Sequence, residues 1–131
     1  MKKFIIKVKG HKYLEESENY RTYLLTLGHS KYGALSKYRY LLEFFCELEQ
    51  KGIHQIKQIQ TKHLSEHYQS LKNRPNKITG EPLSLKTLHQ HMRAIQLFFA
   101  QQQSENKITI NPADSIRFPY PKFEDRQSER Q

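Results

Sequence analysis

Apolar residues recur at every third or fourth position in four separate stretches of this 131-residue chain. This spacing places the apolar side chains of each stretch on one face of an α-helix. Helices with one apolar face bury it by packing against each other. The sequence therefore predicts an all-α protein, a compact bundle of four main helices followed by a short C-terminal helical turn.

Polar caps and chain-breaking residues mark the expected ends of these helices. Ser17, Thr61 and Ser84 are predicted N-caps, because a hydroxyl oxygen can accept a hydrogen bond from the free N–H groups at a helix start. Gly28 can adopt the positive φ that ends a helix, and Pro75 cannot continue one. The expected helices are 17–27, 32–51, 62–72 and 85–103, with a final turn that ends near residue 116. On the second helix the expected core face is Leu35, Tyr38, Leu41, Leu42, Phe45 and Leu48.

The chain divides into three parts by composition. Residues 1–14 form a basic N-terminal arm that contains five lysines and no acidic residue. Apolar residues alternate along this arm as in a strand, but no other segment offers a partner strand, so an extended arm is expected. Residues 15–118 form the helical domain. Residues 119–131 are expected to be a linker, because they are mostly polar and rich in proline at their start.

Positive charge is in excess and unevenly placed. The chain has 22 Lys and Arg against 13 Asp and Glu, a formal net charge of +9. Such an excess favours a polyanionic partner. No acidic residue lies between Glu81 and Glu105, whereas acidic residues gather within 15–18 and 43–49. No apolar run approaches the ~20 residues of a membrane-spanning helix, so no association with a membrane is expected.

No catalytic or metal-binding site is favoured by the sequence. Residues 63–67 match the string H-x-x-E-H of one zinc-peptidase class, which places His63 and His67 on one helical face. No predicted neighbouring helix offers a third ligand, so a solvated, weakly basic face is the preferred interpretation and a zinc site the weaker alternative. Cys46, the single cysteine, excludes an internal disulfide and is expected to be buried and inert. There is no glycine-rich phosphate loop, and no cofactor is expected.

Nucleic-acid binding is favoured by the polar faces of the second and fourth helices. Lys86, Gln90 and Arg93 are spaced so that they share one face, opposite the apolar residues of the fourth helix. Their side chains are donors suited to phosphates and to base edges in the major groove, which accommodates one α-helix. The second helix begins with a similar basic, hydroxyl-rich half, which ends at Glu43. Two such helices would fit against one duplex.

Three groups of residues resemble the core-binding (SAM-like) domain of tyrosine recombinases of the phage-integrase type. The resemblance covers residues 16–120. Its opening group is Gly28-His29-Ser30, Leu35, Tyr38-Arg39, Leu42 and Phe45. Its second group, similar to the last long helix of that domain, is Leu83-Ser84, Thr87, Met92, Ala94-Ile95 and Phe98-Phe99. Its closing group is Ile108, Ile110, Asn111-Pro112-Ala113 and Ile116.

The resemblance implies one half of a C-shaped clamp around double-stranded DNA. It implies a cytoplasmic, nucleoid-associated prokaryotic protein that acts in DNA integration and recombination. The partners implied besides DNA are the protein's own catalytic domain and sister protomers on the same DNA. The nucleophilic tyrosine would lie in that following domain, so no catalytic residue and no metal ligand is assigned in this chain. The expected DNA-binding residues are Lys31, Lys37, Arg39, Tyr40, Ser84, Lys86, Thr87, Gln90 and Arg93.

A different class of function is a helical protein-interaction module whose basic surface recruits an acidic partner. The feature that would distinguish it is an exposed apolar groove in place of an acid-free polar face.

Overall fold

The computed structural model describes residues 8–73, 81 and 83–114. Over these residues the chain is all-α and contains no strand, which confirms the predicted four-helix bundle. A 3₁₀ turn that the sequence analysis missed lies between the second and third helices. The elements are α1 (His11–Thr26), α2 (Lys31–Gln50), η1 (Ile56–Gln58), α3 (Thr61–Asn73) and α4 (Leu85–Ser104).

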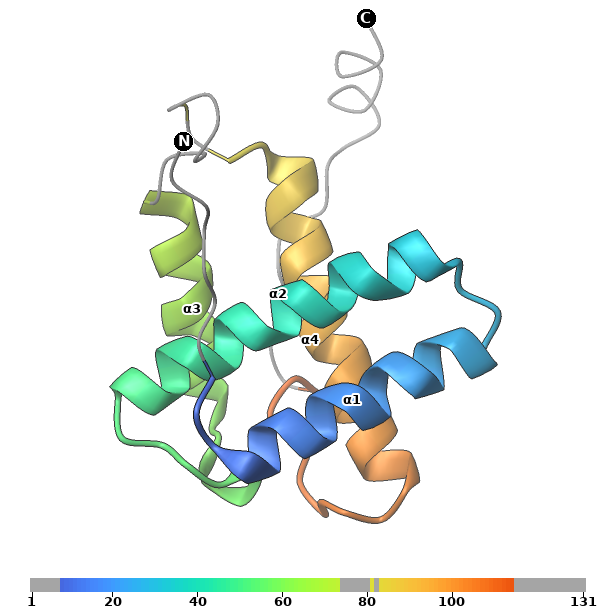
Figure 1. Cartoon of the computed structure of the whole chain (residues 1–131). Helices are drawn as coiled ribbons and strands as arrows, with labels where there is room; N and C mark the ends of the chain where they lie inside the picture. The colour runs from blue at the N-terminus through green and yellow to red at the C-terminus, as the bar shows by residue number, and fades with distance from the viewer. Residues whose placement is uncertain (1–7, 74–80, 82, 115–131) are drawn as a thin grey trace, which may run out of the picture.

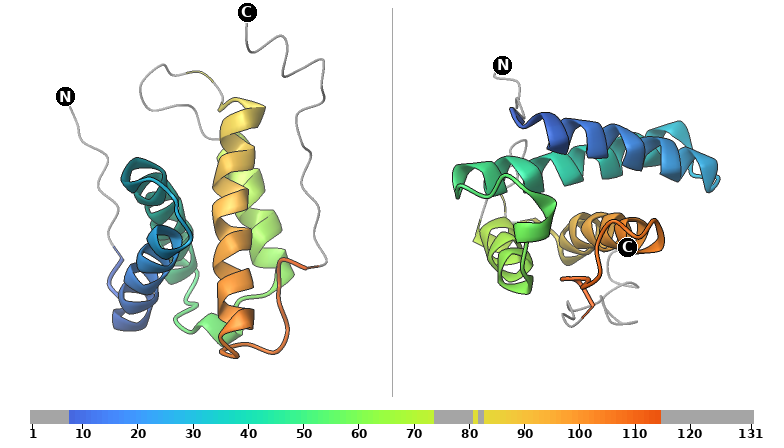
Figure 2. Two further views of the ribbon diagram at one scale, coloured as in Figure 1. Left: turned by 90° about the vertical axis from the view of Figure 1, so that its right-hand side faces the viewer. Right: turned by 90° about the horizontal axis from the view of Figure 1, so that it is seen from below.

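The helices form two crossed layers. α1 and α2 run antiparallel and make one layer, and α3 and α4 run antiparallel and make the other (Figure 1). The views in Figure 2 show the two layers packed face to face. α2 and α4 are the central helices of the two layers, because each of them contacts all three other helices.

Aromatic side chains fill the space between the layers. Phe45 of α2 stacks on Tyr13 of α1 with ring centroids 4.3 Å apart, and it meets Phe98 of α4 edge to face at 5.3 Å. Tyr20 of α1 is also buried, and its hydroxyl donates to the carbonyl oxygen of Ala94 at 2.8 Å. These contacts join three helices, and edge-to-face aromatic pairs add to the free energy gained from burial alone.

The first helix begins earlier than predicted. α1 starts at His11, and Ser17 lies inside it with its hydroxyl donating to the carbonyl oxygen of Tyr13, so the predicted N-cap at Ser17 is wrong. The start is instead held by Glu49 of α2, whose carboxylate accepts from the backbone N–H groups of Lys9 at 2.9 Å and Gly10 at 2.5 Å. Positions 11–14, assigned above to the basic arm, are therefore helical.

The other predicted ends agree more closely with the structure. α2 matches its expected range within one residue, and Gly28 and Gly52 both have positive φ, +95° and +80°, after α1 and α2. Thr61 is the first residue of α3 and not its N-cap. At this helix start the Nδ1 atom of His63 accepts a hydrogen bond from the backbone N–H of Gln60.

The tail after α4 turns back along the helices without forming a helix within the described residues. Asn111 closes a tight turn, because its side-chain oxygen accepts from the backbone N–H of Ala113 at 2.8 Å. The carbonyl of Pro112 accepts from the hydroxyl of Thr61, which fixes the tail to α3. The rest of the predicted final turn, the linker 119–131 and residues 1–7 of the arm lie outside the described residues.

The predicted N-cap of α4 is confirmed and supports a first testable prediction. Ser84 Oγ accepts a hydrogen bond from the backbone N–H of Thr87 at 3.1 Å. Ser84→Ala is expected to lower the free energy of unfolding by about 1 kcal/mol, because this N–H loses its acceptor. Denaturant unfolding measures the change. The control is Ser65→Ala at an exposed position of α3, which is expected to change stability by at most about 0.5 kcal/mol; equal losses in both variants would contradict the capping role.

Candidate nucleic-acid interface

A groove of about 390 Å³ lies between the first halves of α2 and α4. It contains two cationic side chains, Lys37 from α2 and Arg93 from α4, and no acidic side chain lines it. Each of the two helices therefore contributes one cationic side chain to the same space. The lining residues are Tyr32, Gly33, Ser36, Lys37, Tyr40, His89, Gln90 and Arg93.

Four of the nine predicted DNA-binding residues line this groove, namely Lys37, Tyr40, Gln90 and Arg93. Gln90 and Arg93 are exposed on α4, whereas Lys37 and Tyr40 are half-buried on α2. Lys31 and Arg39 are exposed on α2 but do not line the groove. Arg39 is two residues from Lys37, and successive helical residues are separated by about 100°, so the two side chains leave α2 in different directions.

The remaining predicted residues lie at the start of α4. The Ser84 side chain is engaged in the cap, and its hydroxyl also donates to Thr87 Oγ1 at 3.0 Å. Lys86 is exposed one helical turn before Gln90. These residues extend the basic face of α4 toward its N-terminus, although they do not line the groove itself.

Four groove residues were not predicted as part of the site, namely Tyr32, Gly33, Ser36 and His89. The Tyr32 side chain is 82% exposed, the most exposed aromatic ring that the structure describes, and it stands in the first turn of α2. The signal was available in the sequence, because Tyr32, Ser36 and Tyr40 are spaced four residues apart and so share one helical face. Gly33 contributes no side chain, and a Cβ at this position would lie 3.2 Å from the hydroxyl oxygen of Ser30.

One lining residue of the groove, Tyr40, packs against a buried histidine, His91. The Tyr40 ring lies against the His91 imidazole with centroids 3.8 Å apart, and His91 Nδ1 lies 3.6 Å from a carboxylate oxygen of Glu43. Burial, together with the nearby Glu43 carboxylate, raises the pKa of Tyr40 above its ordinary value. Its hydroxyl therefore stays protonated at neutral pH and can donate a hydrogen bond to an acceptor in the groove.

The two histidines of α3 are buried and contact other parts of the protein, so the prediction that they lie on a solvated face is wrong. His63 and His67 are 7% and 3% exposed. His63 accepts the hydrogen bond at the helix start, and His67 Nδ1 lies 3.3 Å from a carboxylate oxygen of Glu47. Within the described residues no three His, Cys, Asp or Glu side chains are grouped closely enough to hold a metal ion. Cys46 is half-buried, not fully buried as predicted.

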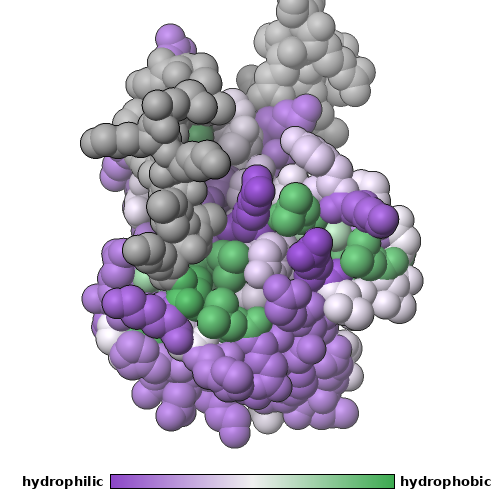
Figure 3. Space-filling view, in the orientation of Figure 1, coloured by the Kyte–Doolittle hydropathy of each residue, from purple (hydrophilic) through white to green (hydrophobic). Residues whose placement is uncertain are grey.

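Large exposed apolar side chains are dispersed over the described surface. The face in Figure 3 is mostly hydrophilic; its apolar side chains form one connected group near the middle and smaller groups beside it. The large apolar residues with the greatest exposure are Leu14, Leu25, Leu27, Tyr32 and Ile110, on α1, α2 and the tail. No described helix is both long and apolar enough to cross a membrane.

Comparison of the chain with protein-family models, with curated proteins and with solved structures finds no match. The groove is therefore interpreted from its own residues. It combines two cations, an amide, two tyrosines and a histidine around a carboxylate-free space.

Proposed function

We propose that this chain is a double-stranded DNA-binding module of a site-specific tyrosine recombinase or integrase, and that it binds the duplex through α2 and α4. The observation that carries the proposal is the carboxylate-free groove that Lys37 and Arg93 share. DNA presents a dense row of phosphates, and neutralising them with Lys and Arg releases bound counterions. The lopsided charge of the chain, with a net +9, favours the same partner.

Each group in the groove has a distinct proposed role. Lys37 and Arg93 contact phosphates as charged donors, and Tyr40 adds a neutral donor. Gln90 is the proposed base reader, because its amide can both donate and accept, as adenine recognition requires. α4 is the helix that enters the major groove, with Lys86 contacting the backbone near the N-terminus of the helix.

The test is the salt dependence of duplex binding. If about four phosphates are contacted, the log–log slope of affinity against salt is expected to be about −3.5. The double variant Lys37→Ala, Arg93→Ala is expected to bind about 10- to 100-fold more weakly, with a slope smaller in magnitude by about 1.8. Fluorescence anisotropy with a labelled duplex, repeated over a salt series, measures both quantities.

The matched control removes two lysines elsewhere. Lys62 and Lys72 are exposed on α3 and do not line the groove. Lys62→Ala, Lys72→Ala leaves the same net charge as the groove variant, so a purely nonspecific effect of basicity would weaken both variants equally. Equal losses, or no duplex binding by the wild-type chain at low salt, would overturn the proposal.

The proposed role in recombination follows from the resemblance and extends beyond this chain. One half of a clamp binds DNA weakly when it is separated from the other half, because the avidity of the pair is lost. The catalytic arginines, histidine and tyrosine would be supplied by a following domain, and sister protomers would assemble on the same nucleoid DNA. The coding sequence downstream of residue 131 tests this: a His-x-x-Arg pair and a late tyrosine are expected there.

A further inference from the structure

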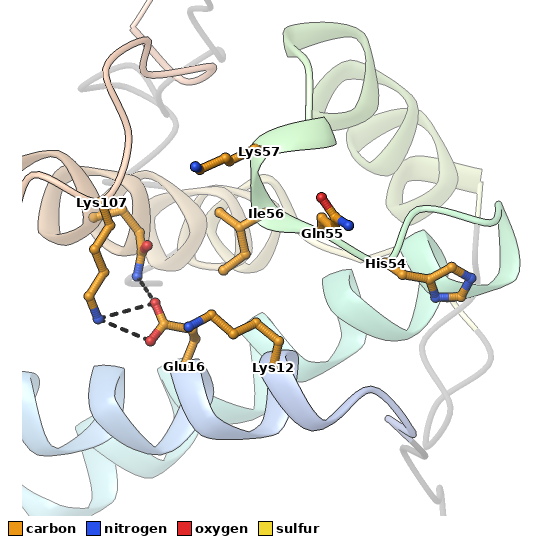
Figure 4. A pocket seen from close by; sticks show the side chains of 8 residues that line it. Lys12, Glu16, His54, Gln55, Ile56, Lys57 and Lys107 are labelled. Atoms are coloured by element: carbon orange, nitrogen blue, oxygen red, sulfur yellow. Dashed lines mark hydrogen bonds and ion pairs between the residues drawn. The ribbon is translucent and has the colours of Figure 1, made fainter.

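A second hollow, of about 520 Å³, lies at the other end of α4 from the groove. α1, the segment around η1 and the residues just after α4 enclose it (Figure 4). Its volume is in the range of pockets that hold small molecules. Its lining residues are Lys12, Glu16, His54, Gln55, Ile56, Lys57, Gln102 and Lys107.

The one carboxylate in this pocket is already satisfied by the protein. Glu16 is 1% exposed and accepts hydrogen bonds from Gln102 Nε2 at 2.5 Å, Lys107 Nζ at 3.0 Å and Asn19 Nδ2 at 3.1 Å. Lys107 also lies 3.3 Å from a carboxylate oxygen of Glu105. The Glu16 carboxylate therefore has three hydrogen-bond donors within the protein, and Glu16 is a buried lining residue of the pocket.

Two further lysines in the pocket have no such partner. Lys12 comes from α1 and Lys57 from η1, and neither forms an ion pair with a carboxylate in the described part of the chain. In Figure 4 their side chains extend from different segments along the two sides of Ile56, and the end of Lys12, like that of Lys107, lies near the Glu16 carboxylate. Ammonium groups gathered in one hollow repel one another, and an anion held between them offsets this repulsion.

We propose that this pocket binds a phosphate-bearing small molecule of about mononucleotide size. Lys12 and Lys57 hold the phosphate group, because two ammonium groups supply the charged donors that a dianion requires. His54 and Gln55 provide further polar contacts, and Ile56 provides an apolar surface for the rest of the molecule. The site is separate from the α2–α4 groove and does not depend on DNA binding.

The test uses inorganic phosphate, adenosine 5′-monophosphate and adenosine with the full chain. Amide NMR spectra are expected to show saturable shifts at residues 54–57 with the two phosphate-bearing compounds, with the nucleotide binding more tightly, and none with adenosine. Lys12→Ala and Lys57→Ala are each expected to weaken nucleotide binding about tenfold, the loss of one charge-assisted contact. Both residues are exposed, so the variants are expected to keep the wild-type fold, which their spectra also report.

Lys62→Ala is the matched control and is expected to bind the nucleotide like the wild type. Shifts confined to the α2–α4 groove, unsaturated shifts, equal binding by adenosine, or unchanged affinity in both pocket variants would each overturn the proposal. Because duplex binding is read out at Lys37 and Arg93, failure here is distinguishable from failure of the proposed function.

Discussion

Phe98→Ala is expected to lower the free energy of unfolding by about 3–5 kcal/mol, a large share of the stability of a domain this size. Phe98 has no exposed surface. Its ring meets Tyr20 of α1 at a centroid distance of 5.8 Å and Phe45 of α2 at 5.3 Å, both edge to face. Truncation therefore leaves a cavity where three helices meet, and neighbouring rings cannot close it without losing their own contacts.

Denaturant unfolding followed by circular dichroism measures this loss. Phe98→Leu keeps most of the apolar volume and is expected to lose less than half as much, which keeps the prediction testable if the alanine variant does not fold. Ile110→Ala removes a side chain that is 83% exposed and is expected to change stability by at most about 0.5 kcal/mol. A loss below about 1 kcal/mol for Phe98→Ala would mean that the ring is not part of the shared core.

Glu16→Ala is expected to lower the free energy of unfolding by about 2–4 kcal/mol near neutral pH. The change removes the acceptor of three hydrogen bonds and leaves the buried amide of Gln102 without a partner. It also breaks the link between α1 and Lys107, which follows α4. Glu15→Ala, at an exposed position next in sequence, is the control and is expected to have little effect.

The effect of Glu16→Ala is expected to depend on pH. Burial alone raises the pKa of Glu16, but hydrogen bonds from Gln102, Lys107 and Asn19 outweigh burial and hold this pKa below its ordinary value. A carboxylate with a lowered pKa in the folded state contributes stability above its ordinary pKa, and the contribution is lost as pH falls through the lowered value. The stability difference between wild type and Glu16→Ala should therefore shrink in acid; a difference that is constant with pH would contradict the ionised contact.

Much of the helical architecture was predictable, because each helix carries its own periodic signal. The exact core face of α2 was not. Phe44 and Ala34 are fully buried although neither was predicted, whereas Leu35, Tyr38 and Leu42 are only half-buried. α2 packs against α1 on one side and α3 and α4 on the other, and its buried face is rotated relative to the stripe that apolar spacing alone indicates.

The candidate interface was predicted only in part. Helical spacing gives the face of a side chain but not how far along the helix the groove extends, so Lys86 shares the predicted face of Gln90 and Arg93 and does not line the groove. Of the residues chosen for the basic start of α2, Lys37 and Tyr40 line it. Gln90 and Arg93 were placed by their shared helical face, and both line the groove. Lys31 and Arg39 were chosen because their segment is basic, and both point elsewhere. Tyr32 was not predicted, although its spacing to Tyr40 indicated the same face.

The hydrogen bonds from the start of α1 to the Glu49 carboxylate affect the order in which the helices can form. The acceptor for the backbone N–H groups of Lys9 and Gly10 lies some forty positions downstream. A peptide that stops after Gly28 would lack this acceptor, and its first turn would fray. During synthesis the opening turn of the protein therefore waits for the far end of its second helix to leave the ribosome.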